Sequence, residues 1–128
     1  VAYHNRIKVD ELGVAATTLD AHGAVSTETA MAMATGARLR AGVDVAISTT
    51  GIAGPAGGTA TKPVGTVHVG IATPTGNCSA HLRFAGVDRA DFKRRSVATA
   101  QMLAVAALTG RWRQAHLFSG VESTTDLR

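Results

Sequence analysis

Short aliphatic stretches alternate along this chain with longer stretches of helix-forming residues. Residues 67–72 alternate apolar and polar side chains with a period of two, which predicts a strand. Residues 43–48 are mostly aliphatic, so we expect them to form a central, largely buried strand. Residues 79–84 are expected to return as an antiparallel partner, and residues 1–3 have the pattern of a strand's end.

Four helices are predicted, at about residues 5–12, 16–21, 27–40 and 89–108. Ser26 and Asp88 have side chains that cap a first helical turn, and glycines follow most of the predicted helix ends. The last helix has late apolar residues that we expect to cover the sheet: Val97, Met102, Leu103, Val105 and Leu108. These elements predict an α/β fold, a three-layer α/β/α sandwich with a mixed sheet.

The composition limits the class of protein further. With 128 residues, 45% of them hydrophobic and 17% charged, the chain has the size of one domain, which we place at residues 1–114, followed by a loosely ordered tail at 115–128. No apolar run approaches the roughly 18 residues of a membrane span, and no leader is evident. The single cysteine, Cys78, excludes an internal disulfide, and we expect a cytoplasmic protein with no membrane partner.

A glycine-rich segment at residues 50–66 joins two predicted strands and is the most informative part of the chain. Its glycines can bring backbone N–H groups close to a ligand and form an anion-binding concavity. A structural crossover remains an alternative, because glycine and proline also serve ordinary turns. The glycine spacing fits neither a P-loop nor a dinucleotide-binding turn.

The formal net charge is +4, from 13 Lys plus Arg against 9 Asp plus Glu. Such a balance suits an anionic small molecule or a nucleic acid, and a solvated basic helix face is the alternative. Nucleic acid is the weaker candidate, since aromatic residues make up only 4% of the chain and no binding motif occurs. The five histidines show no metal-ligand spacing, so no metal site is expected.

Four segments stand out as motifs, in this order along the chain: Tyr3-His4-Asn5-Arg6-Ile7-Lys8, His22-Gly23-Ala24-Val25-Ser26, the run from Thr50 to Thr66, and Phe84-Ala85-Gly86-Val87-Asp88-Arg89. Together they resemble the CinA C-terminal domain family, which contains nicotinamide-nucleotide amidases. The resemblance covers about residues 1–108. It implies hydrolysis of nicotinamide mononucleotide to nicotinate mononucleotide and ammonia by a Ser/Lys mechanism, without metal or organic cofactor.

The resemblance also implies roles for individual residues. Lys8 is the candidate base and Tyr3 a candidate proton relay or amide-orienting group, provided that burial or positive neighbours lower the lysine pKa. Asn5 either caps the first helix or contacts substrate. Arg89 and Lys62 are candidate phosphate contacts. With Asn5, the expected substrate-binding residues are Thr50, Gly51, Ala53, Gly54, Gly57, Gly58, Lys62 and Arg89.

The family's serine-bearing segment is not found in these residues. Ser26 is better explained as a helix cap and Ser48 as part of a buried strand, so neither is assigned as the nucleophile. The chain on its own is therefore expected to lack amidase activity. A non-catalytic, degenerate or assembly domain is the alternative function, and a homodimer is a possible assembly because an incomplete sheet leaves edges to cover.

Overall fold

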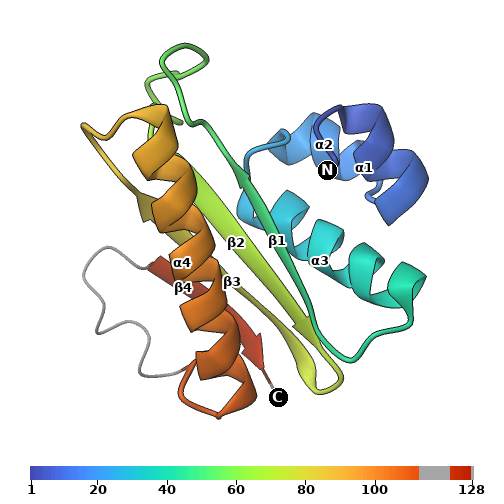
Figure 1. Cartoon of the computed structure of the whole chain (residues 1–128). Helices are drawn as coiled ribbons and strands as arrows, with labels where there is room; N and C mark the ends of the chain where they lie inside the picture. Colours follow the sequence, from blue (N-terminus) through green and yellow to red (C-terminus); the bar gives the residue numbers. More distant parts are fainter. Residues whose placement is uncertain (113–121, 128) are drawn as a thin grey trace.

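The computed structural model describes residues 1–112 and 122–127 and has helices on both faces of one sheet (Figure 1). The elements follow the chain as α1 (Asn5–Leu12), α2 (Ala16–His22), α3 (Thr27–Ala41), β1 (Ala46–Gly51), β2 (Thr66–Thr73), β3 (Gly76–Arg83), α4 (Arg89–Leu108) and β4 (Glu122–Leu127). The predicted α/β class is confirmed, and the four predicted helices agree with the observed ones to within a residue or so.

The sheet has the strand order β1-β2-β3-β4, and each described pairing is antiparallel. The expectation of a mixed sheet is therefore corrected for these strands. The strand predicted at residues 43–48 also differs, since β1 begins only at Ala46 and lies at an edge of the described sheet. The preceding residues belong to the turn after α3, where the Val43 amide donates to Arg38 O at 3.3 Å and Arg38 Nε donates to Asp44 O at 2.9 Å.

Alternation along β2 sends its side chains to two different helices. Val67, Val69 and Ile71 join a core cluster with residues of β3 and α4. The intervening positions face α3, because a Cβ added at Gly70 would meet the backbone of Ala30 in that helix. The sheet is therefore covered by α4 on one face and α3 on the other, which gives three layers.

The buried face of α4 is not the one that its apolar residues predict. Leu103 is buried as expected, but Val97, Met102, Val105 and Leu108 are exposed, with Val105 retaining 60% of its accessible surface. The residues that contact the sheet side are spaced by three and four positions and include small or polar ones: Phe92, Ser96, Ala100, Leu103 and Ala104. The error arose because the predicted set does not lie on one helical face.

The two ends of the chain also correct the sequence interpretation. Residues 1–3 form no strand and run as irregular backbone into α1. The expected loose tail at 115–128 contains β4, which pairs with β3 in a register that sets Thr124 opposite Ser79. Thr124 and Thr125 suit a strand, because β-branched residues favour extended backbone. The remaining tail residues lie outside the described ones.

Close backbone contacts fix α3 between the sheet and α1. Ser48 Oγ of β1 donates to Ala30 O at 2.5 Å, beside the bare Cα of Gly70. On the other side of α3, a Cβ added at Gly36 would overlap the carbonyl group of Leu12 at the end of α1. No helix in the described part of the chain is both long and apolar enough to cross a membrane.

Replacing Gly36 by alanine tests this packing, because helix propensity predicts a gain in stability and the close contact with Leu12 predicts a loss. Within a helix, Gly→Ala normally stabilises by about 1 kcal/mol. Here the added methyl group would overlap Leu12 backbone, so we expect a loss of about 1–3 kcal/mol in the free energy of unfolding, measured by urea denaturation.

Ala98→Gly is the matched control, since Ala98 is exposed on α4 and reports propensity alone. Ala98→Gly should lower the free energy of unfolding by about 1 kcal/mol. A stabilised Gly36→Ala variant would contradict the close approach of α1 and α3.

Candidate functional site

Lys8 is a lysine buried in the first helix of the chain. Its helix begins after the N-cap residue His4, which has extended backbone and makes no side-chain cap, so Asn5 is not the cap that one prediction assigned to it. Lys8 is only 5% exposed, and its Nζ donates to the carbonyl oxygens of Ala2 and Tyr3 at 3.0 and 3.1 Å. The irregular first residues therefore fold over the end of this side chain.

Burial makes the charged form of Lys8 less stable than it is in water. Burial lowers the pKa of the Lys8 ammonium below its ordinary value of 10.5. Within the described residues its polar partners are the two main-chain carbonyls, and no carboxylate pairs with it. Burial of an ammonium away from water and without a countercharge increases the fraction of neutral amine, which can accept a proton.

Tyr3 is adjacent to Lys8 through its backbone. The phenol ring is 79% exposed and packs edge-to-face against His4, with ring centroids 5.6 Å apart. A role for its hydroxyl as a proton relay stays a prediction. Asn5 lies at the same end of α1, where it lines a cavity of about 510 Å³ with His4, Arg6 and Ile7.

The glycines of residues 50–66 are largely accounted for by packing within the protein. A Cβ at Gly51 would approach Thr66 O to 2.6 Å, and one at Gly58 would approach Val64 N to 2.7 Å. Gly54 has a positive φ of 75°, and a Cβ there would also meet Val64, at 2.5 Å. The structural alternative for this segment is thus supported, while the anion-binding concavity stays a prediction.

The other predicted residues of this segment have protein partners. Thr50 Oγ1 donates to Ala24 O at 2.7 Å, which ties β1 to the loop before α3. Ala53 packs against the core cluster. Gly57 has a positive φ of 93° and only an ordinary contact with Ile52, so its backbone conformation explains the glycine.

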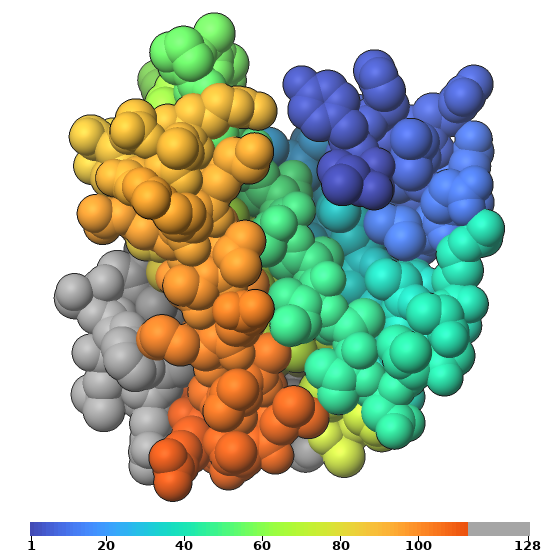
Figure 2. Space-filling model, in the orientation of Figure 1, coloured from blue at the N-terminus to red at the C-terminus, as the bar shows by residue number. Residues whose placement is uncertain are grey.

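Two cationic side chains connect the glycine-rich segment to neighbouring helices. Arg89, the first residue of α4, donates from Nη1 to Gly54 O at 3.1 Å. Lys62 donates from Nζ to His22 O at the end of α2, at 2.6 Å. Figure 2 shows that the segment projects beyond the start of α4, with a hollow between it and the N-terminal residues.

Ser26 and Ser48 have the structural roles expected from the sequence. Ser26 Oγ accepts from Thr29 N at 3.1 Å and is the N-cap of α3, and Ser48 is buried on β1 with its hydroxyl on a backbone carbonyl. Asp88 likewise caps α4 by accepting from Asp91 N at 2.8 Å. The free thiol of Cys78 is buried in the core, where burial raises its pKa to about 12.

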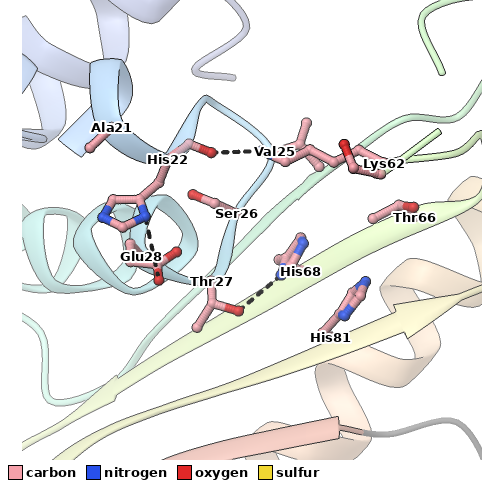
Figure 3. Close-up of a pocket in the computed structure, with 11 residues that line it drawn as sticks. Ala21, His22, Val25, Ser26, Thr27, Glu28, Lys62, Thr66, His68 and His81 are labelled. Carbon is pink, nitrogen blue, oxygen red and sulfur yellow. Dashed lines mark hydrogen bonds and ion pairs between the residues drawn. The ribbon is translucent and has the colours of Figure 1, made fainter. Parts of the chain in front are cut away.

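Sequence reasoning missed one cluster of titratable side chains. His68 and His81 lie opposite each other on β2 and β3, and their rings stack with centroids 4.3 Å apart. Together with Lys62 they line a pocket next to the start of α3 (Figure 3). The strand pairing alone reveals this pair, because spacing rules for helices or short motifs do not relate positions 68 and 81.

The fold and these side chains define an α/β domain with a buried lysine at a helix start and a cationically anchored glycine segment. The family model described as the CinA C-terminal domain matches residues 1–108. The chain belongs to this family, as the four motifs predicted.

Individual relatives agree with this assignment. A CinA-like protein of Mycolicibacterium vanbaalenii is 47% identical over 110 residues, which cover 86% of this chain and 26% of the relative. A CinA-like protein of Desulfosudis oleivorans is 49% identical over 94 residues, covering 73% of this chain and 23% of the relative. The chain thus spans about a quarter of the length of these relatives.

Solved structures show the same fold. The competence/damage inducible protein CihA from Agrobacterium tumefaciens superposes with a TM-score of 0.79 at 41% identity, over 81% of this chain and 64% of that one. A CinA superfamily protein from Escherichia coli gives a TM-score of 0.71 at 37% identity, over 85% of this chain and 60% of that one.

The burial of Lys8 has a measurable effect on stability. Because the pKa of Lys8 is lower in the folded chain than in the unfolded one, the unfolded chain binds more protons between the lowered value and 10.5. Stability therefore carries a penalty at neutral pH that is relieved as pH rises through this window. We expect the difference in unfolding free energy between wild type and Lys8→Met to shift in favour of wild type from pH 7 to pH 10.

Urea denaturation at several pH values measures this difference. Lys93→Met is the control, because Lys93 is exposed on α4 and should show no such trend. A Lys8→Met difference that stays constant with pH would mean that the Lys8 pKa is not lowered.

Proposed function

We propose that this chain supplies the general base and substrate contacts of an amidase that hydrolyses nicotinamide mononucleotide to nicotinate mononucleotide and ammonia. The observation that carries the proposal is the burial of Lys8 against main-chain carbonyls with no carboxylate partner among the described residues. A lysine in this state has a larger fraction of neutral amine at neutral pH, and a neutral amine can accept a proton.

In the proposed reaction, Lys8 serves a serine hydroxyl on the family's upstream segment. Nζ takes the hydroxyl proton as the serine oxygen attacks the carboxamide carbon, and a tetrahedral oxyanion forms. Lys8 then returns the proton to the amide nitrogen, so that ammonia leaves and an acyl-serine remains. Water, deprotonated by the same amine, releases the carboxylate and restores the serine.

The substrate contacts are proposed around the hollow beside the glycine-rich segment. Arg89 uses one N–H on Gly54 O, and a guanidinium has five N–H donors, so others remain for a phosphate oxygen. Asn5 and Tyr3 lie at the start of α1, where the largely exposed phenol is accessible to a ligand. The positive net charge of +4 favours a phosphorylated substrate.

Removing the amine of Lys8 tests the proposal. In the chain extended by the family's serine segment, Lys8→Ala should lower kcat/KM for nicotinamide mononucleotide by about 10²–10⁴-fold, since general-base catalysis contributes on this order. Ammonia release measures turnover, and isothermal titration measures binding of the mononucleotide.

Lys93→Ala is the matched control, because it removes the same charge from the exposed face of α4 and should leave turnover unchanged. Retained turnover in Lys8→Ala would remove the base assignment. Binding without turnover in the extended wild-type chain would favour a non-catalytic domain, and absence of both would exclude this substrate.

A further inference from the structure

A pocket of about 520 Å³ opens between the α2–α3 connection, the segment around Lys62 and the α3 face of the sheet. We call it the His68 pocket. Its volume falls within the range of small-molecule sites, about 300–1,000 Å³. Neither Lys8 nor Tyr3 lines it, so it is separate from the proposed base.

The floor of the His68 pocket is a stacked histidine pair in fixed positions. The rings of His68 and His81 are nearly parallel, 5° apart, because they project from directly opposed residues of β2 and β3. His68 is 8% exposed, and its Nδ1 lies 3.1 Å from Thr27 Oγ1 at the start of α3. This hydrogen bond orients the ring and leaves Nε2 toward the pocket, as Figure 3 shows.

Charged groups of both signs line the His68 pocket, and the positive one that acts on His68 is the Lys62 ammonium. Lys62 Nζ has three N–H donors, of which one is on His22 O, so the others remain for a ligand. Glu28 brings the opposing charge, and its Oε1 lies 3.6 Å from His22 Nδ1. Burial, followed by His81 and Lys62, lowers the pKa of His68 to about 4, while Glu28 acts weakly in the other direction.

These surroundings disfavour a further positive charge at His68 and favour a negative one beside it. An anion in the pocket would pair with the Lys62 ammonium and would also balance the positive charge of a protonated His68 imidazole. The start of the 15-residue helix α3, capped by Ser26, adds a favourable helix dipole at the same edge of the pocket.

We propose that the His68 pocket binds the phosphate group of a small phosphate monoester through the Lys62 ammonium and the His68 imidazole. The volume exceeds what a bare phosphate needs, which leaves room for the group that the phosphate esterifies. Lys62 is also one of the two phosphate candidates of the proposed amidase, but this binding needs no amide, no serine and no Lys8.

Binding is coupled to protonation of the pocket. A bound dianion stabilises the His68 imidazolium and so raises the pKa of His68 from about 4. For a ligand of constant charge, the complex therefore takes up protons, and affinity rises as pH falls toward that value. His81, His22 and Glu28 also line the site, so a His68 variant is needed to assign the share of His68 in the pH dependence.

Isothermal titration of the 128-residue chain with ribose 5-phosphate, and with ribose as the neutral counterpart, tests the site. We expect ribose 5-phosphate to bind and ribose not to bind. Lys62→Met should weaken the binding of ribose 5-phosphate about tenfold or more, and Glu28→Gln should strengthen it. Lys93→Met is the matched control and should bind as wild type. Equal weakening by Lys62→Met and Lys93→Met would overturn the proposal, because attraction would then follow net charge alone.

The histidine contribution is tested with sulfate, whose charge is constant across the range. NMR titration of the His68 Cε1–H resonance should give a higher pKa in sulfate than in chloride at equal ionic strength. Sulfate affinity should rise between pH 7 and pH 4.5, and less steeply in His68→Asn. An unchanged His68 pKa, or binding of ribose as tight as that of ribose 5-phosphate, would overturn the proposal.

Discussion

The contact between α3 and the sheet is the constraint on which both candidate sites depend. Gly70 has no side chain, so Ala30 backbone lies directly against β2, and Ser48 joins the same carbonyl from β1. This contact sets the start of α3 beside the sheet, where Thr27 reaches His68. Because Gly36 lets α1 lie against the opposite side of α3, it also determines where Lys8 is buried.

Lys8 and His68 have lowered pKa values for the same main reason, which is burial, but their remaining surroundings differ. Lys8 contacts main-chain carbonyls, which accept hydrogen bonds from an ammonium and bring no net charge. His68 lies near the charges of Lys62 and Glu28, which shift its pKa. The charge of a bound ligand would act on His68 in the same way. The first environment suits an intrinsic base, whereas the second suits a group whose protonation responds to a bound ion.

Local sequence signals were sufficient to predict the helices. The position of β1 in the sheet and the buried face of α4 depend on long-range packing and could not be predicted in this way. Ser26 and Asp88 cap α3 and α4 as expected, because a cap involves residues three positions apart. The edge position of β1 depends on which strands pair, and this is not encoded within residues 43–48. The exposed apolar residues of α4, such as Val105, show a similar limit, since hydrophobicity alone did not identify the face that meets the sheet.

The candidate sites show the same distinction between local motif and spatial arrangement. Lys8 could be selected from the sequence through a resemblance, but the reason for its lowered pKa lies in how residues 2 and 3 fold over it. The glycines of residues 50–66 suggested a ligand-facing backbone, yet Gly51 and Gly58 are required where the chain meets its own backbone. Close packing can therefore account for much of a glycine signature, and the ligand contacts must be sought among the side chains that this packing positions. His68 is such a side chain, and its nearest ring partner comes from a neighbouring strand that no sequence spacing identifies.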